Sequence, residues 1–280
     1  MELVDAQIHV FDADNERYPW SRGPEFERRR HSTTPFRYEE ALAAMDSAGV
    51  SAAVLVIPGT YGDENGYLLE AASKYPDRFV VIGRISSTAA DLEDRLAIWT
   101  QHPAIKGMRV VVRSPAAEQR WDRGDFLPMF EACAKLNFPV CVNAPSRIRE
   151  LGQIAARLPS LPIHLDHLGI AGPPTTPLTD QTFNALDDVL ALARYPNVAI
   201  KATCVNNLSR EPYPFRDVWQ PLLRVIDAFG VDRVMWGSDI TRNLHPYEEA
   251  VRYIAEIPQL SESDLEKIYA GNVRRLLRWH

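Results

Sequence analysis

The stretch LVDAQIHVF, residues 3–11, is the first of a series of apolar and β-branched runs that decides the fold. Runs of this length, bounded by turn-forming residues, are typical of buried strands. Similar runs recur along the chain at residues 52–58, 79–85, 106–112, 138–144, 162–167, 198–203 and 233–239. The sequence therefore predicts eight strands.

Amphipathic segments lie between these runs. Apolar residues recur three and four positions apart in YEEALAAMDSAG (38–49), LPMFEACAKLN (127–137) and FRDVWQPLLRVIDAFG (215–230), which predicts helices. Strands that alternate with helices form a parallel sheet joined by crossover helices. Eight such units, with no glycine-rich nucleotide loop after the first, favour an α/β fold of the closed (β/α)8 TIM-barrel type over a doubly wound sheet. We expect one such domain over residues 1–280.

Composition and charge exclude several classes of function. The chain is 46% hydrophobic and carries a net charge of −6, whereas nucleic-acid-binding domains usually carry a basic stripe. The cysteines Cys133, Cys141 and Cys204 are widely spaced and odd in number, which argues against a disulfide framework and suits a reducing compartment. No apolar run reaches membrane-spanning length. We expect a cytoplasmic protein that acts on a small molecule, without a nucleic-acid or membrane partner, and the sequence leaves a homo-oligomer open.

Two long irregular segments follow predicted strands. Residues 12–36 follow the first strand and include the basic cluster Arg28–Arg30, and residues 169–180 follow the sixth strand and are rich in Pro and Gly. Loops after the strands of a barrel lie at its active-site mouth, so both segments are candidate substrate lids.

Polar residues at the carboxyl ends of the predicted strands are the candidate site residues, because barrel enzymes place their chemistry there. They are Gln7, His9, Arg84, Arg109, Asn143, His164, Asp166, His167, Lys201, Ser238 and Asp239. Buried charges are costly unless they are paired, so their number favours a functional site over a purely structural role. Structural alternatives remain for some: a core position for His164, an outer-helix partner for Asp166, and an ion pair at the barrel floor for Lys201.

Six motifs carry a resemblance to a known family. They are DAQIHVFD (5–12), KGMRVVV (106–112), LDHLG (165–169), AIKAT (199–203), DRVMWGSD (232–239) and IYAGNVRRLL (268–277). In this order and spacing the chain resembles the amidohydrolase-2 group of the amidohydrolase superfamily, in particular its sugar-lactonase and 2-pyrone-4,6-dicarboxylate lactonase branch.

The resemblance implies hydrolysis of a cyclic ester by water, with Asp239 as the general base. His167 and His9 would bind the carbonyl oxygen or, together with Asp239, one divalent metal ion such as zinc or manganese. The family pattern at the first strand is His-x-His, and this chain has Gln7 in place of the first histidine and Asn143 where many members have another. An amide is a weak ligand for zinc compared with imidazole, so the sequence favours an enzyme without a tightly held metal.

The strand-end cations favour a carboxylated lactone as the substrate. Arg84, Arg109 and Lys201 would bind its acid group, with Gln7 and Trp20 also in contact. A neutral sugar lactone would instead use hydroxyl-binding groups such as Asn143, Asn206, Trp20 and Tyr18. Two other functions stay open: a metal-dependent amidohydrolase or decarboxylase of a small cyclic or aromatic acid, and a non-catalytic barrel that binds a small ligand.

Overall fold

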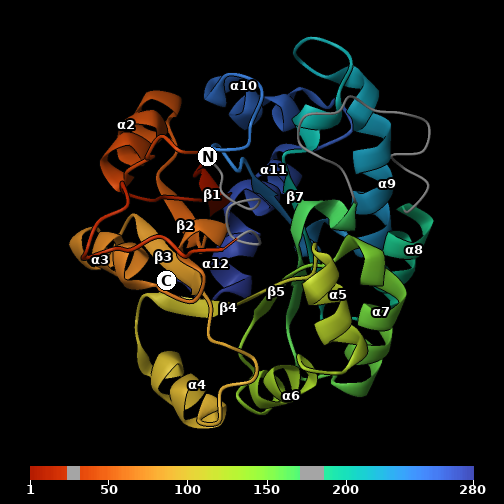
Figure 1. The fold of residues 1–280 in the computed structure, drawn as a ribbon. Coiled ribbons are helices and arrows are strands. Elements are labelled where there is room, and N and C mark those ends of the chain that lie inside the picture. Colours follow the sequence, from red (N-terminus) through yellow and green to blue (C-terminus); the bar gives the residue numbers. More distant parts are fainter. Residues whose placement is uncertain (24–31, 171–185) are drawn as a thin grey trace.

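Eight parallel strands form one sheet that curves into a nearly closed barrel with helices around it (Figure 1), in a computed structural model that describes residues 1–23, 32–170 and 186–280. The strands pair in chain order. Their bounds are β1 Val4–Ile8, β2 Ala52–Val56, β3 Phe79–Gly83, β4 Ile105–Val111, β5 Val140–Asn143, β6 Ile163–Leu165, β7 Val198–Thr203 and β8 Val234–Gly237. The predicted TIM barrel is confirmed, and most strands are shorter than predicted.

The helices lie outside the sheet, and the three predicted ones are present. Their bounds are α2 Tyr38–Ala48, α3 Gly66–Lys74, α4 Leu92–Gln101, α5 Pro115–Asp122, α6 Leu127–Lys135, α7 Ile148–Arg157, α8 Leu186–Leu190, α9 Trp219–Phe229, α10 Tyr247–Arg252, α11 Glu262–Glu266 and α12 Asn272–Leu276. No helix among the described residues is both long and apolar enough to cross a membrane. The Arg28–Arg30 cluster and most of the segment 169–180 lie outside the described residues.

The strands are buried on both faces, as parallel strands covered by helices must be. Alternate residues divide between two clusters, so that Ala53 and Leu55 pack toward the helices while Ala52, Val54 and Val56 fill the barrel. Residues near the C-terminus, including Val273 and Trp279, pack against this inner cluster. With apolar side chains inside the barrel, polar groups gather only where the strands end.

The junction of β1 and β8 is closed by a side chain. Asp5 is fully buried, and its Oδ1 accepts hydrogen bonds from the backbone N–H of Gln7 at 3.0 Å and of Ser238 at 2.9 Å. Its Oδ2 accepts from the hydroxyl of Tyr247 at 3.0 Å. Burial raises the pKa of Asp5 to about 6, against the lowering effect of these donors. One carboxylate therefore links the first strand, the last strand and α10.

Gly237 is required at this junction because the two strands approach closely there. A Cβ at this position would lie 2.5 Å from Thr203 Cγ2 and 3.1 Å from the backbone nitrogen of Gln7. Beyond it, the backbone N–H of Asp239 donates to the carbonyl of Gln7 at 2.9 Å. The junction thus fixes the backbone of two predicted site residues, Gln7 and Asp239, relative to each other.

Candidate active site

Gln7 and His9 lie at the end of β1 and contact side chains from the last strands of the barrel. The Lys201 ammonium donates to Gln7 Oε1 at 3.2 Å, and Gln7 Nε2 lies 3.2 Å from His167 Nε2. His9 Nε2 lies 3.4 Å from Asp239 Oδ1. Both side chains of the Gln-x-His pair therefore reach one site, as their spacing of two residues on a strand predicts.

The proton of the His9 ring is fixed by its neighbour on β2. His9 Nδ1 lies 2.6 Å from the backbone carbonyl of Val56, which can only accept a hydrogen bond. Nδ1 therefore carries the proton, and Nε2 presents its lone pair on the side of Asp239. Arg109 Nη1 lies 3.5 Å from this Nε2 and is its donor.

His167 lies in a tight turn after β6. The predicted strand 162–167 is too long, because β6 ends at Leu165 and the backbone then takes a positive φ of 54° at His167 and 53° at Leu168. Thr203 Oγ1, at the end of β7, accepts from the backbone N–H of His167 at 3.1 Å and lies 2.9 Å from its Nδ1. Thr203 thus holds both the backbone and the ring of His167.

The orientation of Gln7 determines the tautomer of His167. An ammonium only donates hydrogen bonds, so the Gln7 oxygen must face Lys201 and its NH2 group must face His167 Nε2. Nε2 then accepts, and the ring proton lies on Nδ1, where it is donated to Thr203. Burial, together with the positive charges of Arg109 and Arg113, lowers the pKa of His167 to about 4 against the effect of Asp166, so the ring is neutral at pH 7.

Three charged residues form a buried group beside these histidines. Lys201 Nζ lies 3.1 Å from Asp166 Oδ1, and Arg109 Nη2 lies 3.6 Å from Asp166 Oδ2. Burial alone would raise the pKa of Asp166, but attraction to Lys201 and Arg109 lowers it overall, and the pKa of Lys201 is raised in turn. The expected ion pair of Lys201 is present. The outer-helix partner for Asp166 is wrong, because this carboxylate faces Lys201 and Arg109.

Asp239 follows β8 and is almost fully buried. Its backbone φ of 48° is unusual for a residue other than glycine. Among the described residues, its Oδ1 has no hydrogen-bond donor. Burial raises the pKa of Asp239 to about 7, against the lowering effects of Arg109 and Arg242 and with further upward contributions from Asp5 and Asp166. A carboxylate with such a pKa is suited to take and return a proton near neutral pH.

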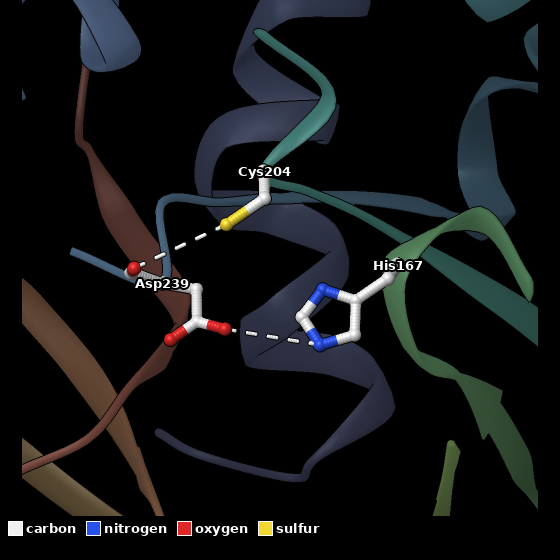
Figure 2. A group of neighbouring side chains, drawn as sticks. All are labelled: His167, Cys204 and Asp239. Atoms are coloured by element: carbon white, nitrogen blue, oxygen red, sulfur yellow. Dashed lines mark hydrogen bonds and ion pairs between the residues drawn. The ribbon is translucent and has the colours of Figure 1, made fainter. Parts of the chain in front are cut away.

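The lone pairs of His9 and His167 converge on Asp239. Nε2 of His9 lies 3.4 Å from one carboxylate oxygen, and Nε2 of His167 lies 3.8 Å from the other (Figure 2). Neither nitrogen carries the proton, so the three groups need a shared proton or a cation between them. Two imidazoles whose Nδ1 protons are bound by oxygen atoms, with one carboxylate, are the donor set of a catalytic zinc site. The residues present fit one divalent ion.

The other candidates occupy distinct positions. Arg84 donates to the carbonyl of Gly62 at 2.9 Å, and Trp20 Nε1 donates to the carbonyl of Asp12 at 2.9 Å. Asn143 ends β5 and is buried. Of the residues proposed for a neutral sugar, Asn206 donates to Asn243 and Tyr18 donates to Glu70. Their hydrogen bonds place none of these five beside the Asp239 carboxylate.

His164 lies in the middle of β6 and is buried, and its ring nitrogens have no hydrogen-bond partner among the described residues. Burial and the charge of Lys201 lower its pKa to about 3, so the ring is neutral. The structural interpretation of His164 is consistent with this environment.

Sequence reasoning did not single out Asp5, Thr203, Arg113 or Arg242. A signal existed for two of them: Asp5 precedes Gln7 by two positions, and Thr203 follows Lys201 by two positions, so each shares a face of its strand with a recognised candidate. Arg113 and Arg242 lie in segments that follow β4 and β8, where residue spacing gives no direction. Their charges act on the pKa values of His167 and Asp239, which places them near the site.

Comparison with protein families identifies the chain. Residues 4–279 match the family model described as amidohydrolase. The chain belongs to the amidohydrolase family. This confirms the resemblance stated above and the prediction of a hydrolase, and it explains why the site lies at the ends of barrel strands.

Several relatives of this amidohydrolase are named as lactone hydrolases. A 4-sulfomuconolactone hydrolase of Hydrogenophaga intermedia is 27% identical over 84% of this chain and 73% of its own length. An L-fucono-1,5-lactonase of Burkholderia ambifaria is 28% identical over 69% of this chain and 65% of its own length. The crystal structure of an amidohydrolase from Burkholderia multivorans with bound zinc has the same fold, with a TM-score of 0.80, 19% identity and 99% of each chain covered.

Proposed function

We propose that this amidohydrolase opens a small lactone that carries an acidic group, with Asp239 as the general base. The observation that carries the proposal is the buried Asp239 Oδ1, which faces His9 Nε2 and has no hydrogen-bond donor among the described residues. A reacting water can occupy such a position and donate to the carboxylate. The lactone hydrolases among its relatives support the reaction class.

The proposed reaction needs few groups. Asp239 takes a proton from water as the water oxygen bonds to the lactone carbonyl carbon, and the ring carbon–oxygen bond then breaks. The proton passes from Asp239 to the leaving oxygen, which yields an open hydroxy acid. We assign polarisation of the carbonyl to Arg109, whose Nη1 already lies near His9 and whose buried Nε has no acceptor among the described residues.

A divalent ion held by His9, His167 and Asp239 would supply a Lewis acid for the same carbonyl. The sequence alone favours a reaction without a tightly held metal, because Gln7 replaces a histidine. In the structure the Gln7 oxygen is bound by Lys201, so it offers this ion no ligand atom. Activity measured before and after treatment with a chelator tests the requirement.

The acidic group of the substrate is assigned to a different set of cations from those first expected. Arg109 and Lys201 are both engaged with Asp166, so they contribute less positive charge toward a substrate carboxylate. Arg113 and Arg242 act on the pKa values of His167 and Asp239 from outside this group. We propose that these two arginines attract the acid group. The name of the sulfomuconolactone relative, which gives a sulfo-substituted lactone, agrees with this choice.

Turnover on a panel of lactones tests the proposed function. The panel contains acidic lactones and neutral sugar lactones, each assayed with the protein as purified and with added zinc or manganese. We expect hydrolysis, with a higher kcat/KM for the acidic members. Preference for the neutral members would contradict the acidic substrate. Hydrolysis of none would leave the non-catalytic binding barrel as the better account.

The pH dependence of kcat/KM tests the assignment of the base. Asp239 must be deprotonated to accept a proton from water, and burial raises its pKa to about 7. For protein freed of metal by chelation, kcat/KM is therefore expected to rise with pH and to reach half of its plateau near pH 7. An ordinary exposed aspartate would give a midpoint near pH 4 instead, and that result would contradict a buried base.

A further inference from the structure

Cys204 lies beside His167 and Asp239, on a segment that the proposed reaction does not use. It directly follows β7 and takes a positive φ of 54°. Its Sγ donates to the backbone carbonyl of Ser238 at 3.2 Å, next to Asp239. One ligand-type atom from each of Cys204, His167 and Asp239 lies within 4.8 Å of the other two (Figure 2).

A buried thiol is often only a small apolar group, so the neighbours of Cys204 decide its interpretation. Asp239 is buried, and its Oδ1 has no hydrogen-bond donor among the described residues. His167 keeps its Nε2 lone pair because its proton is bound by Thr203. A thiol, a lone pair and an unsatisfied carboxylate oxygen therefore meet in one place, and they come from the ends of three successive strands, β6, β7 and β8.

The residue at position 7 contributes no ligand to this group. The Gln7 oxygen is bound by Lys201, and its NH2 group faces His167. A fourth donor must come from elsewhere if an ion is to be held firmly. Cys204 is such a donor, and thiolate is a stronger ligand for zinc than an amide oxygen.

We propose that Cys204 is a metal ligand in this protein, as a thiolate, together with His167 and Asp239, with His9 beside them. On binding, the sulfur–metal bond replaces the S–H bond, and the thiol proton is released to solvent. A divalent ion with one thiolate and one carboxylate forms a neutral unit, which suits a buried position. This donor reverses the expectation of no tightly held metal that followed from Gln7 alone.

The ligand set also predicts which ions bind. Thiolate is a soft ligand that selects zinc and cobalt over manganese and magnesium. We therefore expect zinc to displace cobalt, and manganese in similar concentration to leave cobalt bound. The inference concerns metal binding alone, so it and the proposed lactone hydrolysis can fail independently.

Titration of the chelator-treated protein with Co²⁺ tests the proposal without an activity assay. Cobalt bound by a thiolate gives a sulfur-to-metal charge-transfer band in the near ultraviolet, which nitrogen and oxygen ligands do not give. We expect this band to saturate at one Co²⁺ per chain. In Cys204→Ser the band is lost, and the affinity for Co²⁺ falls by more than about tenfold, which is the smaller effect of losing an outer-shell partner.

Two controls make the result specific. Cys133→Ser changes another buried thiol, on α6, and is expected to keep the band and the affinity. Thermal unfolding of Cys204→Ser shows whether the variant is folded, and Cys204→Ala serves as a second variant if it is not. A band that survives loss of Cys204, cobalt bound without the band in the original protein, or no cobalt binding at all would each overturn the proposal.

Discussion

Replacing Asp239 with asparagine lowers kcat for lactone hydrolysis by about 10³-fold, within the range that a general base contributes. Asparagine keeps the shape of the side chain and cannot accept the proton from water. The backbone bond from Asp239 to the carbonyl of Gln7 does not depend on the carboxylate, so the junction of β1 and β8 is retained. Steady-state kinetics on the best lactone of the panel measures the effect.

The stability of the same variant separates loss of the base from loss of the fold. The pKa of Asp239 is about 7 in the folded protein, above the value near 3.9 of an unfolded aspartate, so the folded state binds this proton more tightly. The contribution of this group to stability is thus greatest at low pH and falls as pH rises from about 4 to 7. At pH 8 asparagine removes a buried charge, and the melting temperature is expected not to fall.

A matched control is available for this experiment. Asp232 carries the same side chain but is largely exposed and pairs with Lys267 at the surface. Asp232→Asn is expected to leave kcat unchanged. Full activity in Asp239→Asn would remove Asp239 as the base.

Replacing Lys201 with methionine lowers the free energy of unfolding by about 3–5 kcal/mol, the usual effect of removing one partner from a buried ion pair. Asp166 is fully buried and keeps only Arg109, whose Nη2 is 3.6 Å away. Gln7 also loses the ammonium that fixes its amide, so its NH2 group is no longer directed at His167. Denaturant unfolding of the variant measures the loss.

An exposed pair provides the control for this second experiment. Lys135 and Glu93 form an ion pair at the surface in which both side chains are about two-thirds exposed. Lys135→Met is expected to change stability by less than about 1 kcal/mol. Adding Asp166→Asn to Lys201→Met removes the uncompensated charge and is expected to recover part of the lost stability. Equal losses at positions 201 and 135 would contradict a structural role for the buried pair.

The barrel was predictable because its signal is local. Alternating apolar runs and amphipathic segments give the number and order of strands, and parallel strands end at the same side of a sheet. That rule alone brings His9, His167 and Asp239 together. The spacing of Gln7 and His9 correctly places both side chains in the same site.

The direction of individual side chains was not predictable where the chain leaves a strand. β6 ends at Leu165, and positive φ angles then turn the backbone at His167 and Leu168. The inward direction of Asp166 follows from contacts with β4 and β7, which lie far away in sequence. For the same reason, the role of Gln7 depends on Lys201, and the proximity of Cys204 to Asp239 depends on the pairing of β7 with β8.

The closure of β1 against β8 has a consequence for how the enzyme becomes active during synthesis. Gln7 and His9 are among the first residues to leave the ribosome, and Asp239 is made only after seven of the eight strands. Contacts so distant in sequence form late, because the intervening chain must be ordered first. Catalytic competence is therefore acquired in a single final event, when the last strand docks on the Asp5 carboxylate and on the carbonyl of Gln7. A partly made chain holds most of the barrel and none of the activity.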